Sequence, residues 1–412
     1  MHLVEDDFFP ILFIFLSTVF LSLIIRGNNK LEFKYLILLG FFLRIFIMAA
    51  DYFQLFHVFG SGADTEAFHL IALSNQMTQS WRSLTNYTYF LTYVYSITES
   101  SRLIAQYINV LFGLGTIVFV ERLLSLLYID KKIKKIAVLF VVLLPNLIIF
   151  SGILLREAWI TFFISASLFY FIRWFINGSN SDIILSISMV LLATLMHSGV
   201  IGILAGYCIA FLIYNPTNQK VQFSMGSIIS LLLLVGGIVI FLNYSNLFTS
   251  KFASYDIDNP DAFVELTNRK SRGGSAYLSW INVDNMALSF LFAPLIMFYF
   301  LFSPLPTEWR GFADILGFCI DGAAYLWLCV AIFRSKRLPV TGESLRKFLL
   351  ISILFTVFIF AFGVRNAGTA MRHRAKFVPL IIVTYAVSVG YKKNKSLILK
   401  QRSLENFAQA KK

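Results

Sequence analysis

The feature that most constrains this chain is a series of long apolar runs that are nearly free of charge. Residues 8–25 form an uncharged run long enough to cross a lipid bilayer as a helix, because about 20 apolar residues span the hydrocarbon core. Comparable runs continue as far as residue 391. Hydrophobic residues make up 58% of the chain and charged residues only 14%. Because a soluble domain carries nearly twice that share of charge, the sequence predicts a polytopic membrane protein.

We expect an all-α fold, because lipid offers the backbone no hydrogen-bond partners and helices satisfy their own groups. The runs predict one membrane domain over residues 1–412, with about eleven or twelve transmembrane or re-entrant helices. No soluble domain and no internal repeat are expected. The N-terminus is acidic and no small-residue cleavage site follows residues 8–25, so we expect the first helix to be retained.

The net charge of +13 comes largely from basic turns between the runs, at residues 26–30, 131–135 and 334–337, and from the tail 392–412. Such turns usually lie in the cytoplasm. Nucleic-acid binding is not expected, because it requires a soluble basic surface. The three cysteines lie in apolar segments without disulfide or zinc spacing, and no metal or nucleotide motif is present. We expect no metal and no cofactor.

The order of the runs leaves one ambiguity. Residues 182–214 are short for two spans and long for one, and we favour two short helices that meet near His197 at the outer side. Counting every run as a span then puts residues 334–337 outside, against their charge. Either 182–214 crosses once, or 286–302, with Pro294 in its middle, is a hairpin or a broken helix. The expected outer-face loops are about 53–101, 145–157, 243–284 and 365–376.

A first polar cluster follows the glycine-flanked turn at Gly60 and Gly62. In a helix, Glu66 and His69 would be neighbours on one face, and Asp64 would lie near the helix start, where a carboxylate is favoured. A solvated loop at the membrane surface would explain the cluster equally simply. The alternative is a general base for a sugar hydroxyl, because a low-dielectric surrounding tunes the pKa of a carboxylate.

Two further candidates lie in the middle of the chain. Arg156 and Glu157 open an apolar run, either as an interfacial anchor or as the lining of a polar cavity in which a guanidinium binds phosphate. His197 lies alone between two apolar helices, either as a structural residue or as an acid/base or pyrophosphate contact.

The fourth cluster, residues 365–376, carries Arg365, Arg372 and Arg374. The basic turn at 334–337 and the tail are each one span away from it, so this cluster cannot share their side. Several arginines together suit a diphosphate, both for binding and for stabilising it as a leaving group. Arg272, beside a Gly-Gly-Ser run, would close over the same site as a mobile loop.

The motifs Leu155-Arg156-Glu157-Ala158, His197-Ser198 and Arg372-His373-Arg374 together resemble bacterial membrane polysaccharide polymerases of the Wzy/EpsG type. The Asp64 stretch also resembles the first outer loop of GT-C membrane glycosyltransferases, where a carboxylate is the catalytic base. The resemblance implies a polymerase for O-antigen or exopolysaccharide in the bacterial inner membrane, with its site facing the periplasm. Its substrates would be oligosaccharides linked to undecaprenyl pyrophosphate, and a chain-length co-polymerase is a possible partner.

On this interpretation the diphosphate is held by five arginines: Arg156, Arg272, Arg365, Arg372 and Arg374. The acceptor hydroxyl is activated by Asp64, Glu66, His69 or His197. Two alternatives remain open. A GT-C enzyme with a polyprenyl monophosphate donor would need fewer arginines. A flippase of lipid-linked sugars would need charged residues within the spans, and the spans read as nearly charge-free.

Overall fold

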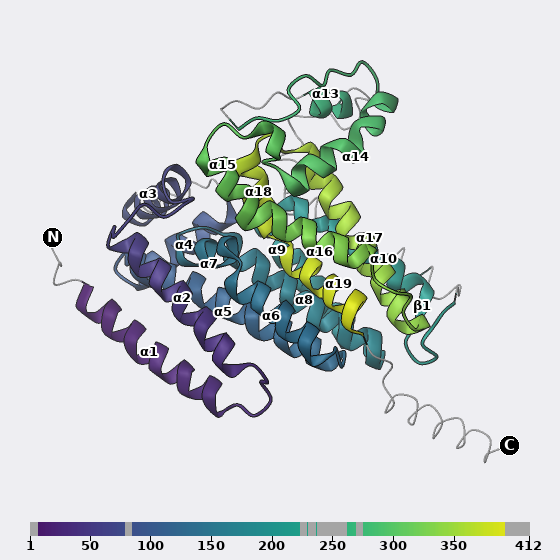
Figure 1. Cartoon of the computed structure of the whole chain (residues 1–412). Helices are drawn as coiled ribbons and strands as arrows, with labels where there is room; N and C mark the ends of the chain where they lie inside the picture. The colour runs from purple at the N-terminus through teal and green to yellow at the C-terminus, as the bar shows by residue number, and fades with distance from the viewer. Residues whose placement is uncertain are drawn as a thin grey trace, which may run out of the picture.

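The computed structural model describes residues 7–78, 85–222, 262–268 and 275–391, with residues 229 and 236 (Figure 1). Arg272, most of the 243–284 loop and the basic tail lie outside the described residues. The predicted all-α fold is confirmed. Within the described ranges the strands are limited to a short antiparallel pair, β1 (Tyr214–Asn215) and β2 (Lys220–Val221).

Six helices in the described part of the chain are long and apolar enough to cross a membrane, or seven if the bent pair α6 and α7 counts as one span. The protein is therefore a multi-pass membrane protein. The six are α1 (Phe8–Gly27), α2 (Lys34–Tyr52), α5 (Arg102–Leu126), α8 (Glu157–Asn177), the stretch Asp314–Phe333 and α17 (Val340–Phe362). Shorter apolar helices are α9 (Asn180–Met196), η2 (Ser198–Gly202) with α10 (Ile203–Ile213), α14 (Met286–Phe302) and α19 (Val378–Gly390).

Local sequence explains where several of these helices begin, bend or end. Pro145 lacks a backbone N–H, so α6 (Lys131–Leu143) stops before it and α7 (Pro145–Gly152) restarts with proline at its first position, at a bend of 43°. Gly178 ends α8 in the left-handed conformation that glycine adopts without strain. The stretch Asp314–Phe333 begins inside α15 (Phe312–Gly317). It continues through a π-helical turn at Phe318–Gly322 and ends with α16 (Ala323–Phe333).

The helix ends gather at two ends of the bundle. At the first, which we call the basic end, Lys134 pairs with Glu32 at 2.7 Å and the Asp130 N–H donates to the Gly390 carbonyl at 2.8 Å. The opposite end, which we call the site end, contains α3 (Ala63–Thr78), α4 (Asn86–Ile97), the start of α8 and α18 (Ala367–Ala375). Figure 1 shows α3, α15 and α18 at the upper left, opposite β1 at the lower right.

The structure shows how the two ambiguous segments fold. Residues 182–214 form two helices, α9 and α10, which meet at His197, as we favoured. Residues 286–302 form one helix, α14, with Pro294 inside it, rather than a hairpin or a broken helix, and this helix is shorter than the six candidate spans. Just before it, the Tyr277 N–H donates to the Arg365 carbonyl, and just after it the Ser303 carbonyl accepts from Arg374. The segments on both sides of the apolar α14 therefore contact α18 or Arg365, which closely precedes it.

The expectation of nearly charge-free spans is also too simple. Arg44 in α2 is 1% exposed and donates to the carbonyls of Gly40 at 2.8 Å and Val141 at 3.0 Å. Asp321 in the π-helical turn is equally buried and pairs with Arg374 and Asn146. These groups tie α2 to α6 and the π-helical turn to α18 and α7, so each buried charge has a packing role.

Candidate active site

Arg372 joins two carboxylates from distant parts of the chain. Its Nε donates to Glu157 Oε1 at 2.6 Å, and its Nη1 forms an ion pair with Asp64 Oδ2. The sequence separations are 215 and 308 residues, so only the fold brings these groups together. Both carboxylates lie in the first turn of a helix and Arg372 lies in the last turn of α18. Each charge therefore has the sign that its helix dipole favours.

Lys376 completes the contact with Glu157. Its Nζ lies 3.2 Å from the same Oε1 atom, and both side chains are 1% exposed. Burial lowers the pKa of the Lys376 ammonium to about 7, although Glu157 opposes the change. The positive charges of Arg372 and Arg156 lower this pKa further. Lys376 is thus a buried cation whose charge depends on pH near neutrality.

Arg156 adds a third cation. It interacts electrostatically with Glu157, Arg372 and Asp64, and burial lowers its pKa. Its buried Nε has no hydrogen-bond partner among the described residues. Asp64, Arg156, Glu157, Arg372 and Lys376 form what we call the Arg372 cluster. Because it contains three basic and two acidic side chains, its net charge favours an anionic ligand.

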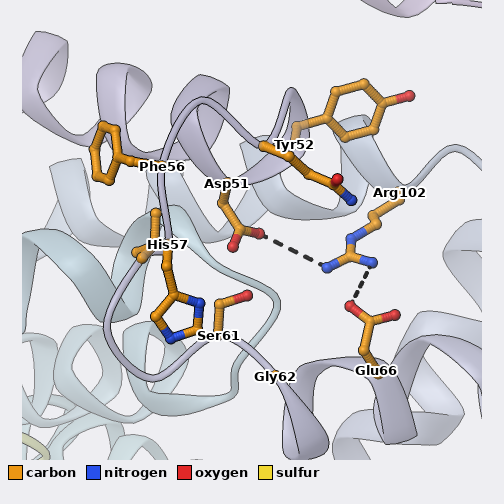
Figure 2. A pocket seen from close by; sticks show the side chains of 10 residues that line it. Asp51, Tyr52, Phe56, His57, Ser61, Gly62, Glu66 and Arg102 are labelled. Carbon is orange, nitrogen blue, oxygen red and sulfur yellow. Dashed lines mark ion pairs between the residues drawn. The ribbon is translucent and has the colours of Figure 1, made fainter. Parts of the chain in front are cut away.

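A second polar group lies beside the cluster and is shown in Figure 2. Arg102 lies 2.8 Å from Glu66 and 3.7 Å from Asp51, whose Oδ2 also accepts from Gln106 Nε2 at 2.6 Å. These groups face an open pocket of about 430 Å³, which we call the Arg102 pocket. It is lined by Asp51, Tyr52, Gln54, Phe56, His57, Val58, Ser61, Gly62, Glu66 and Arg102.

The glycine turn before α3 positions both groups. Gly62 has φ +137°, which side-chain-bearing residues rarely adopt. Its carbonyl accepts from Thr65 Oγ1 and from the Glu66 N–H, each at 2.9 Å. These hydrogen bonds fix the first turn of α3. In this turn, Asp64 pairs with Arg372 and Glu66 lines the Arg102 pocket. The two regions are therefore neighbours along one helical turn.

The predicted histidines His69 and His197 both lie at the site end. His69 Nδ1 is 2.7 Å from the Tyr95 hydroxyl, and burial, reinforced by Arg102, lowers its pKa against the effect of Glu66. His197 is buried, and its ring lies 4.8 Å from that of His373 and 5.0 Å from that of Phe360, centroid to centroid.

Two of the predicted arginines have different surroundings from those expected. Arg374 is fully buried, pairs with Asp321, and donates to the carbonyls of Phe300, Leu301 and Ser303. Its donors are thus occupied by the protein, and we correct its assignment from diphosphate binding to holding α14 against α18. Arg365 is 5% exposed and donates to the Thr267 carbonyl at 2.6 Å, which ties the connection between α17 and α18 to α13 (Ala262–Asn268).

Sequence reasoning overlooked Lys376, Asp51 and Arg102. Lys376 ends the same basic run that contains Arg372, so its membership could have been predicted. Arg102 opens an apolar helix directly after the capping residue Ser101, which is the signal that drew attention to Arg156. The pairing of Arg102 with both Asp51 and Glu66 has no local signal.

The fold and this site together define a class: a multi-pass, all-α membrane protein with a buried cationic cluster and a carboxylate pocket at one end. Comparison with protein-family models, with curated proteins and with solved structures finds no match to this chain.

Proposed function

We propose that the protein is a membrane glycosyltransferase that extends a polysaccharide by transferring a glycan from a polyprenyl diphosphate to a second lipid-linked unit. The observation that supports this most is the Arg372 cluster, in which three cations meet two carboxylates at the mouth of the helical bundle. Keeping charged side chains at the end of an apolar helical bundle costs free energy, so we expect these residues to have a function.

The cations would bind the diphosphate. The guanidinium groups of Arg372 and Arg156 match phosphate oxygens in a bidentate manner, and Lys376 adds a point charge. In the structure Arg372 is paired with Asp64, whose side chain is 58% exposed. A diphosphate carries more charge than a carboxylate and would displace Asp64 from Arg372. Substrate binding would thus release the carboxylate that the reaction needs.

The reaction then follows from the released group. Asp64 accepts the proton of the acceptor hydroxyl, whose oxygen forms a bond to the anomeric carbon of the donor glycan. The bond between that carbon and the diphosphate oxygen breaks, and its electron pair leaves with the lipid diphosphate. The cations stabilise the developing charge on this leaving group, as preorganised donors do at reacting centres. Glu157, buried beneath Arg372, is a positioning residue.

The position of the basic turns supports one orientation of the protein in the membrane. The basic turns lie at the basic end, and the positive-inside tendency would place that end in the cytoplasm of a bacterial inner membrane. The Arg372 cluster would then face the periplasm, where lipid-linked repeat units are joined. A chain-length co-polymerase remains the expected partner. A monophosphate donor fits less well, because three cations exceed what one phosphate requires.

Transport of lipid-linked sugars is the alternative that the buried charges of Arg44 and Asp321 would favour. The contacts of both residues are, however, with backbone carbonyls or with buried protein partners. These charges fit helix packing better than a transport path.

The test is polymer length in cells whose own copy is replaced by a variant. We expect Asp64→Asn and Arg372→Gln to abolish long polymer while lipid carrying a single repeat unit persists. The matched control is Lys131→Gln, a 79% exposed lysine at the basic end, which should leave long polymer unchanged. Normal long polymer in Arg372→Gln at normal membrane levels would refute the proposal. Loss of both the polymer and the single-unit product would support transport instead.

A further inference from the structure

The Arg102 pocket differs in charge from the Arg372 cluster beside it. Asp51 and Glu66 share one guanidinium, so the three groups carry a net negative charge. The Asp51 side chain is 4% exposed and that of Glu66 47% exposed. A negatively charged pocket repels a phosphate or a carboxylate ligand. The pocket therefore suits a different part of the substrate from the diphosphate.

The lining suits a sugar ring. Asp51 uses only Oδ2 and Glu66 only Oε1 in the ion pairs and hydrogen bonds recorded among the described residues, so each has a second oxygen able to accept from a hydroxyl. Tyr52, Phe56 and His57 are also among the residues that line the pocket. The volume of about 430 Å³ lies within the range typical of small-molecule pockets, roughly 300–1,000 Å³.

Asp51 is also held in a fixed orientation. Gln106 is fully buried behind it and donates to Oδ2 at 2.6 Å, while Arg102 approaches the same oxygen. Figure 2 shows the Asp51 carboxylate between Arg102 and the loop that carries His57 and Ser61. A carboxylate fixed in this way binds hydroxyls with little loss of conformational freedom.

We propose that the Arg102 pocket binds an uncharged or amine-bearing sugar ring of the lipid-linked glycan and excludes acidic sugars. The link to a lipid-linked glycan rests on the proposed function, whereas the charge selectivity rests on the pocket alone. Because Asp64 and Glu66 lie in the same turn of α3, the ring bound here is next to the diphosphate. The pocket thus sets which sugars can lie at the transfer site.

The test uses purified protein in lipid nanodiscs and three sugars of similar shape: glucose, glucosamine and glucuronate. Binding is measured by saturation-transfer NMR in mildly acidic buffer, where glucosamine is protonated. We expect glucosamine to bind at least as tightly as glucose, and glucuronate to bind most weakly. Because hydrogen bonds to charged groups are among the stronger ones, Asp51→Asn should weaken glucosamine binding roughly ten- to a hundredfold and reduce the discrimination against glucuronate.

Glu66→Gln provides a second variant, because its more exposed side chain makes a folding defect less of a concern. The matched control is Glu99→Gln, an exposed carboxylate in the turn between α4 and α5, which should change nothing. Equal binding of the three sugars, or unchanged selectivity in folded Asp51→Asn and Glu66→Gln protein, would overturn the inference.

Different results would refute the proposed function and the inference about the Arg102 pocket. If Asp64→Asn protein still makes long polymer while the sugar selectivity holds, the transfer mechanism is wrong and the pocket inference stands. If long polymer is lost as expected but the sugars bind equally, the pocket inference is wrong and the proposed function stands.

Discussion

Arg372 pairs with two carboxylates of very different exposure, and this contrast makes a quantitative prediction. The Asp64 side chain is 58% exposed and that of Glu157 is 1% exposed. An exposed ion pair contributes about 0–1 kcal/mol. Removing one partner of a buried pair costs about 3–5 kcal/mol, because the other charge stays buried without compensation. Asp64→Asn should therefore cost under about 1 kcal/mol of stability, and Glu157→Gln several times more.

The charge of Lys376 determines how large the loss of stability caused by Glu157→Gln is within the range of about 3–5 kcal/mol. The pKa of Lys376 is already about 7 with Glu157 present, so loss of the carboxylate favours the neutral amine further. Since a neutral Lys376 no longer needs a counter-charge, the lost carboxylate affects mainly Arg372, which keeps Asp64 as a partner, and Arg156. We expect a cost near the lower bound, about 3 kcal/mol.

The assay combines thermal unfolding in detergent micelles, followed by tryptophan fluorescence, with polymer length in cells. Asp64→Asn protein should unfold at nearly the wild-type temperature yet make no long polymer. Glu157→Gln protein should unfold at a clearly lower temperature and reach lower membrane levels. The two substitutions are matched, because each replaces a carboxylate by its amide and removes one negative charge.

A double-mutant cycle tests whether Arg372 and Glu157 are energetically coupled. Arg372→Gln should cost less in the Glu157→Gln background than in the wild type, because the charge that it removes has already lost its buried partner there. Equal costs in the two backgrounds would show that Arg372 and Glu157 are not coupled. Equal destabilisation by Asp64→Asn and Glu157→Gln would refute the claim that burial sets the strength of the two pairs.

Three further predictions follow from the structure. Because the pKa of Lys376 is lowered from 10.5 to about 7, the unfolded chain binds more protons between these values and stability should rise with pH there, by up to about 1.4 kcal/mol per unit. Lys376→Met should remove that rise in melting temperature measured against pH. Asp321→Asn leaves the fully buried Arg374 without its carboxylate and should cost about 3–5 kcal/mol, seen as loss of monodisperse protein in gel filtration. Gly62→Ala forces alanine to φ +137° and should cost about 1–3 kcal/mol and reduce long polymer, whereas Gly27→Ala, which has open space and no positive φ, should do neither.

Sequence reasoning predicted the features that depend on composition and on nearby residues. The apolar runs imply helices, because the membrane requires every backbone group to be satisfied within the segment. The turn at Gly62 and the first turn of α3 follow from local chemistry in the same way, whereas the loop expected at 145–157 is partly the helix α7. The choice of Asp64, Arg156 and Arg372 also rested on local signals, namely charges placed at the ends of apolar helices.

The tertiary structure alone decided which of these charges meet. Arg372 and Arg374 are two residues apart, yet one faces Asp64 and Glu157 while the other is enclosed by Asp321 and backbone carbonyls. On a helix, residues two apart lie on different faces, so the neighbouring helices determine the surroundings of each. Composition therefore established a helical membrane protein, and long-range packing determined which arginine can bind a substrate.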